Sequence, residues 1–69
     1  MKYAVVIERG ATSFGAYVPD LPGCVAVGQS REEVVQLIHD AITMHLEGLR
    51  EDGAPVPPPD TAVTIVEVS

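Results

Sequence analysis

The sequence predicts a small α+β domain in which three strands, one helix and a final strand follow one another over 69 residues. Two stretches near the N-terminus are rich in β-branched and aromatic residues and are separated by a glycine-containing turn. A helical pattern then begins at Ser30, and residues 61–68 alternate again like a strand. We expect one domain, residues 1–69, in which the helix covers one face of a small, mainly antiparallel sheet.

The first three strands follow from local composition. Residues 2–8 and 14–18 have the side chains that strands favour, and the turn around Gly10 joins them most simply as a hairpin. Residues 24–27 predict a short third strand that ends at Gly28.

A tightly specified loop, Pro19-Asp20-Leu21-Pro22-Gly23, separates the second and third strands. Both prolines fix φ near about −65°, and Gly23 permits the positive φ that a sharp reversal requires. The loop is either a plain connection or a binding loop held on a rigid scaffold. The spacing alone leaves both interpretations open.

The helix has clear start and stop signals. Ser30 and Glu33 have the spacing of a capping box, and Gly53 is placed to end the helix after about Glu51 or Asp52. Its apolar arc is roughly 200° wide, about twice what packing on one side requires. Gly48 interrupts this arc, and we attribute it to close approach of the sheet.

The last part of the chain predicts a spacer and a strand. Residues 55–59 are nearly all proline and favour a stiff connection, although a ligand for a proline-recognition domain is the rival interpretation. Residues 61–68 are expected to pair beside the first strand. Both faces of the first strand are apolar and one helix covers only one face of the sheet, so we predict self-association.

Charge and cysteine content restrict the function. Ten Asp and Glu residues against four Lys and Arg give a net charge of −6. This balance disfavours nucleic-acid binding and suits a basic partner. Cys24 is the only cysteine, which excludes an intrachain disulfide and agrees with a reducing compartment. With no signal peptide or membrane span recognisable, we expect a cytoplasmic protein.

The residues required for catalysis are not grouped in the sequence. Cys24 with His39 or His45 is the best candidate for nucleophilic catalysis, but Cys24 begins an apolar strand, where cysteine is typically buried. The carboxylates that could bind a catalytic metal are spread over a strand end, two loops and the helix, at Glu8, Asp20, Asp40 and Asp60. We therefore expect no enzyme, no cofactor and no metal. The rival hypothesis is a small hydrolase or nuclease that uses Cys24 or these carboxylates.

The segment 17–24, followed by Gly28-Gln29-Ser30 and by Glu32-Glu33 at the helix start, resembles the HicB-like antitoxin domain over residues 2–68. The resemblance implies a β-β-β-α-β, partial ribonuclease-H-like fold. It also implies a partner, a small basic messenger-RNA-cleaving toxin of the HicA type. Typical members continue into a ribbon-helix-helix or helix-turn-helix segment that binds operator DNA. This chain stops at Ser69, so we expect no direct nucleic-acid binding by it.

The resulting hypothesis is a non-enzymatic, self-associating antitoxin that neutralises its toxin by occlusion. The alternative of a different class is an orphan scaffold domain that only self-associates. The residues expected to contact the partner are Pro19, Asp20, Leu21, Pro22, Gly23, Glu32, Glu33, Asp40 and Glu47.

Overall fold

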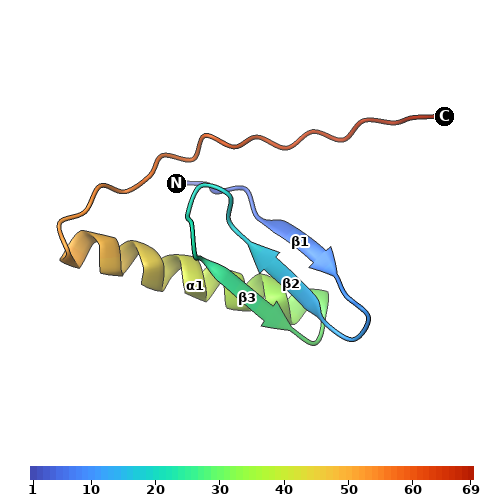
Figure 1. Ribbon diagram of the computed structural model, residues 1–69, viewed down its shortest axis with the longest axis horizontal. Helices are drawn as coiled ribbons and strands as arrows, with labels where there is room; N and C mark the ends of the chain where they lie inside the picture. The colour runs from blue at the N-terminus through green and yellow to red at the C-terminus, as the bar shows by residue number, and fades with distance from the viewer.

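The computed structural model describes residues 1–69 as a three-stranded sheet with one helix on one face (Figure 1). The elements are β1 (Val6–Arg9), β2 (Phe14–Tyr17), β3 (Val25–Gly28) and α1 (Arg31–Glu51). The predicted α+β class, with a small antiparallel sheet and one helix, is confirmed.

The sheet is antiparallel throughout, with β2 between β1 and β3. The register aligns Ile7, Ala16 and Ala26 across the three strands, and these residues belong to the hydrophobic core or pack against it. The neighbouring row carries its side chains to the opposite face, because successive strand residues alternate. β1 begins at Val6 rather than at the predicted Lys2, since β2 ends at Tyr17, directly opposite Val6.

The core lies between the sheet and the N-terminal half of α1. Its six buried residues are Ala16, Val18, Leu21, Cys24, Val34 and Ile38. Three of them belong to the segment between β2 and β3, so the predicted loop is part of the core as well as a connection. α1 packs against β3 and β2 (Figure 1), and β1 stays at the edge of the layer.

Both ends of α1 follow the sequence signals. The Glu33 amide donates to Ser30 Oγ at 3.1 Å, and the Gln29 amide donates to Glu33 Oε1 at 2.7 Å. The first bond satisfies an amide that the first helical turn leaves free, and the second ties the Glu33 side chain back to the residue before the N-cap Ser30. At the other end, Gly53 has φ 68°, the left-handed conformation that ends a helix.

Gly48 has no close neighbour. A Cβ at this position would meet nothing within 4 Å, so the predicted close approach of the sheet is wrong. We expect Gly48→Ala to raise the free energy of unfolding by about 0.5–1 kcal/mol, because alanine loses less backbone entropy in a helix. Urea denaturation of both proteins measures the change. A lower midpoint for Gly48→Ala would show that this glycine has a packing role.

The predicted fourth strand is not formed within the chain. Residues 54–69 have no regular secondary structure, and Figure 1 shows them leaving α1 and running past the β1 side of the sheet without joining it. The radius of gyration of 13.5 Å exceeds the roughly 11 Å typical of a compact chain of this length. A strand requires a hydrogen-bonded neighbour, and alternation in the sequence does not supply one.

Two contacts tie the beginning of this C-terminal segment to the domain. Tyr3 Oη donates to the carbonyl of Pro57 at 2.6 Å. The Asp20 carboxylate accepts from the Thr61 amide at 3.0 Å and from the Thr61 hydroxyl at 2.8 Å. Residues 62–69, which we call the C-terminal tail, make no hydrogen bond to the rest of the chain.

Candidate interaction surfaces

The loop between β2 and β3 is closed by its own backbone. The Leu21 amide donates to Val18 at 3.0 Å, the Cys24 amide to Leu21 at 3.0 Å, and the Val18 amide to Cys24 at 3.2 Å. Gly23 takes φ 85°, as the sequence predicts for a reversal at this position. These consecutive turns hold the loop in one conformation.

The five predicted contact residues of the loop do not share one environment. Pro19, Pro22 and Gly23 are exposed, whereas Leu21 is completely buried in the core. Asp20 is half-buried, and both of its carboxylate oxygens accept hydrogen bonds from Thr61. The exposed surface of this loop is therefore formed by the two prolines and the glycine, and the buried Leu21 side chain fixes the loop to the core.

Three of the predicted acidic residues form a line along α1. Glu33, Asp40 and Glu47 are seven residues apart, so they lie on one side of the helix at intervals of about 10.5 Å. All three are exposed, and Glu32 is exposed one position away. Glu33 is also the capping-box partner of Ser30, and one of its carboxylate oxygens accepts from the Gln29 amide at the helix start.

The negative charge of this line has no cationic partner from Lys or Arg. The one contact with salt-bridge geometry joins His39 Nδ1 and Asp40 Oδ1 at 3.4 Å, between two exposed side chains, and it is an ion pair only when His39 is protonated. Asp40 also accepts from Gln36 Nε2 at 3.1 Å. Because a solvent-exposed histidine pair contributes little, the carboxylates present a net negative surface.

Two apolar side chains of α1, Leu37 and Met44, lie beside the acidic line, at the edge of the helix's apolar arc. Leu37 is 40% exposed and Met44 is 72% exposed. They face solvent because α1 packs against two strands only, so its buried arc is narrower than the apolar pattern. Their place at the border between the apolar arc and the polar face was the available signal. We call Glu33, Leu37, Asp40, Met44 and Glu47 the acidic helix face.

The sheet presents a second apolar surface on the side away from α1. Tyr17 is 41% exposed, and Val25 and Val27 are 63% and 66% exposed. Tyr17 and Val25 are directly paired across β2 and β3. No element of the chain covers this face, as expected for a sheet with one helix.

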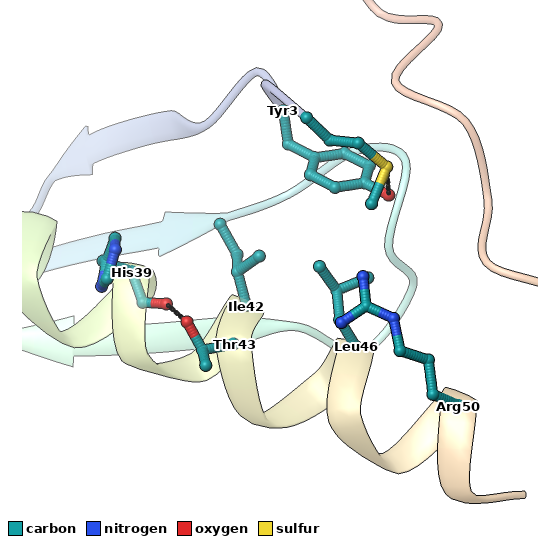
Figure 2. Close-up of a pocket in the computed structure, with 7 residues that line it drawn as sticks. Tyr3, His39, Ile42, Thr43, Leu46 and Arg50 are labelled. Carbon is teal, nitrogen blue, oxygen red and sulfur yellow. Dashed lines mark hydrogen bonds between the residues drawn. The ribbon is translucent and has the colours of Figure 1, made fainter.

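A cavity of about 360 Å³ opens between the start of the chain and α1. Its lining residues are Met1, Tyr3, His39, Ile42, Thr43, Leu46 and Arg50. Figure 2 shows Tyr3 above the cavity, with Ile42 and Leu46 projecting toward it from the helix. Because α1 packs against β3 and β2, a gap remains between the helix and the chain that leads into β1. We call this gap the β1 pocket.

The structure does not assemble either catalytic arrangement considered from the sequence. Cys24 is 4% exposed, and burial raises the pKa of its thiol, which disfavours the nucleophilic thiolate. His39 is exposed on α1 and contacts Asp40 rather than Cys24. No three His, Cys, Asp or Glu side chains gather in a way that would hold a metal ion. α1 also lacks the combination of length and apolar character needed to cross a membrane.

Comparison with known families gives one match that spans nearly the whole chain. Residues 3–68 match the model described as the HicB_like antitoxin of bacterial toxin-antitoxin system. Among solved structures, the chain is similar to one from a HicA3 and HicB3 toxin-antitoxin complex, with a TM-score of 0.73 and 30% identity. That match covers 86% of this chain and 70% of the other.

Individual relatives come from phage, bacteria and archaea. The chain is 35% identical over 57 residues to a 14.9 kDa protein of the rep-hol intergenic region of Haemophilus phage HP1. It is 31% identical over 61 residues to antitoxin HicB 2 of Photorhabdus laumondii. These matches cover 83% and 88% of this chain but only 43% and 44% of the relatives. A UPF0150 protein of Helicobacter pylori is 43% identical over 47 residues, which are 68% of this chain and 65% of that protein.

Proposed function

Because this chain belongs to the HicB-like antitoxin family of bacterial toxin-antitoxin systems, we propose that it neutralises a small, basic, messenger-RNA-cleaving toxin of the HicA type. The mechanism is occlusion, in which the antitoxin covers the surface where the toxin binds RNA. The observation that carries this proposal is the row of exposed carboxylates on α1 with no Lys or Arg partner.

A ribonuclease binds RNA largely through cations that meet phosphates. The acidic helix face offers the same cations a row of carboxylates, which attracts the toxin over a distance and orients it on approach. Leu37 and Met44 add apolar contact beside the charges, and methionine adapts well to a partner surface. Charge and apolar area together suit a protein partner better than a small ion.

The loop between β2 and β3 contributes a second, rigid part of the contact surface. Pro19, Pro22 and Gly23 are exposed on a loop closed by backbone hydrogen bonds, so little conformational entropy is lost when a partner binds there. Asp20 and Leu21 act indirectly, through Thr61 and through the core. Glu32 adds charge near the start of α1.

We place this function in the cytoplasm and without catalysis by the antitoxin itself. The buried Cys24 thiol, whose pKa is raised, is consistent with a structural role in the core. We also propose that the chain works as a homo-oligomer, because large apolar side chains are exposed on the outer face of the sheet and on the C-terminal tail.

The test uses a purified small, basic toxin of the HicA type, sought in the reading frames next to the gene for this chain. We expect stoichiometric inhibition of its RNA cleavage. Asp40→Lys together with Glu47→Lys should weaken binding by about 10- to 100-fold and flatten its salt dependence, since reversed charges repel a basic partner. Calorimetry or surface plasmon resonance at about 50 and about 300 mM salt measures both effects.

The matched control reverses two exposed charges away from α1, Glu8→Lys together with Asp60→Lys. Both double variants have the same net charge, so only the position of the charges differs. Asp20 is unsuitable for reversal because it would also release Thr61. Equal weakening in both double variants would assign the effect to overall charge and remove the acidic helix face from the proposal. Unimpeded RNA cleavage at antitoxin excess would contradict neutralisation itself.

A further inference from the structure

The β1 edge of the sheet and the C-terminal tail each lack a pairing partner within the chain. β1 pairs with β2 on one side only, and residues 2–5, which lead into it, belong to no strand. The tail makes no hydrogen bond to the rest of the chain. Unpaired strand edges and exposed β-prone segments both favour pairing with another chain.

The residues of the tail are those typical of a buried strand, but their side chains are exposed to solvent. The tail contains no glycine or proline and is dominated by β-branched residues. Val63, Ile65, Val66 and Val68 are 70–94% exposed. At eight residues it is as long as the segment 2–9 that forms the start of the chain and β1.

The β1 pocket lies where an added strand would place its side chains. A strand paired along β1 projects alternate side chains toward the helical layer. On that side the structure leaves a cavity of about 360 Å³ with Tyr3, Ile42 and Leu46 in its wall. The tail therefore has exposed apolar side chains that could fill this cavity, and the cavity is open to receive them.

We propose that two copies of this chain exchange their C-terminal tails, each adding its tail as a strand to the β1 edge of the other and filling the β1 pocket there. The exchange is reciprocal, so one two-fold dimer satisfies both unpaired edges. This inference rests on the self-association proposed above and is independent of toxin binding.

Two features favour a second copy over the other occupants. The chain's own tail is led past the sheet by the hydrogen bonds of Thr61 to Asp20 and does not reach β1. A basic toxin is a poor match for the tail, whose only charged side chain is Glu67, and has a better match on the acidic helix face. An identical chain offers an apolar edge of the right length.

Proline scanning of the full-length protein tests the exchange. In a strand with one neighbour, alternate amides donate to that neighbour and the others face solvent, where proline is tolerated. We compare Thr64→Pro, Ile65→Pro and Val66→Pro. Either Ile65→Pro alone weakens the dimer, or Thr64→Pro and Val66→Pro weaken it and Ile65→Pro does not. The sensitive positions should weaken the dimer at least about tenfold by analytical ultracentrifugation. The hydrophobic core contains no residue of the tail, so the helical signal in circular dichroism should not change, whereas the strand content should fall when the dimer is lost.

Hydrogen exchange locates the partner strand. In the dimer, the amides of residues 2–8 that do not donate to β2 should be protected, and this protection should be lost in the sensitive proline variants. The amides of Val25 and Val27 should exchange alike in all of them. Protection that instead disappears from β3 would contradict pairing at β1. Equal effects of all three prolines, or none, would overturn strand addition while leaving self-association in place. A wild-type monomer at about 100 µM would overturn both and leave toxin neutralisation to its own assay.

Discussion

Leu21→Ala should leave most of the protein unfolded at 25 °C. Leu21 is fully buried at the centre of the core although it lies in a loop. Truncating a buried leucine to alanine costs about 2–5 kcal/mol, and a domain of this size rarely has more than about 3–5 kcal/mol in total. Alanine keeps the backbone hydrogen bonds of residue 21 with Val18 and Cys24, so the expected loss comes from the buried side chain.

Leu37→Ala is the matched control, since the same atoms are removed from a side chain that is 40% exposed on α1. We expect Leu37→Ala to lower the free energy of unfolding by about 1 kcal/mol or less, because the Leu37 side chain is only partly removed from water on folding and alanine favours the helix. Urea denaturation followed by circular dichroism compares the two. Similar midpoints for both variants would show that the loop is not anchored by Leu21, and the rigid contact surface proposed for Pro19, Pro22 and Gly23 would lose its basis.

Gly28→Ala should also destabilise the domain, by about 1–3 kcal/mol. A Cβ at Gly28 would lie 2.9 Å from the amide nitrogen of Val34 and 3.1 Å from its Cα. Both atoms belong to the backbone of α1, and the Val34 side chain is completely buried, so the helix can move away only by opening the core. The cause is close packing of β3 against the first turn of α1.

Gly15→Ala provides the control within the same sheet. A Cβ there would meet nothing within 4 Å, and we expect a change of no more than about 0.5 kcal/mol. Because Gly28 also sets the position of the helix start, Gly28→Ala should weaken toxin binding at temperatures where the variant is still folded. Equal stability of the two variants would contradict the close packing.

Local features of the fold were predictable from the sequence because nearby residues determine them. The Ser30–Glu33 capping box, the positive φ of Gly23 and the helix end at Gly53 depend on hydrogen bonds and steric limits within a few residues. The resemblance that identified the family rests on the same local motifs. Helical spacing alone also places three of the predicted contact residues, Glu33, Asp40 and Glu47, on one side of α1.

Contacts between distant parts of the chain decided the remaining features. Alternation in residues 61–68 shows that they can form a strand, but it does not show which edge they join. In the structure Thr61 bonds to Asp20 and the residues after it run past the sheet without joining it. The apolar pattern of α1 likewise cannot show how many strands it will cover, and therefore not that Met44 is exposed. By itself the sequence determined the first three strands, the helix with both of its ends, and the resemblance to the family. Only the tertiary structure decided which surfaces remain uncovered, because burial and strand pairing depend on neighbours that are remote along the chain.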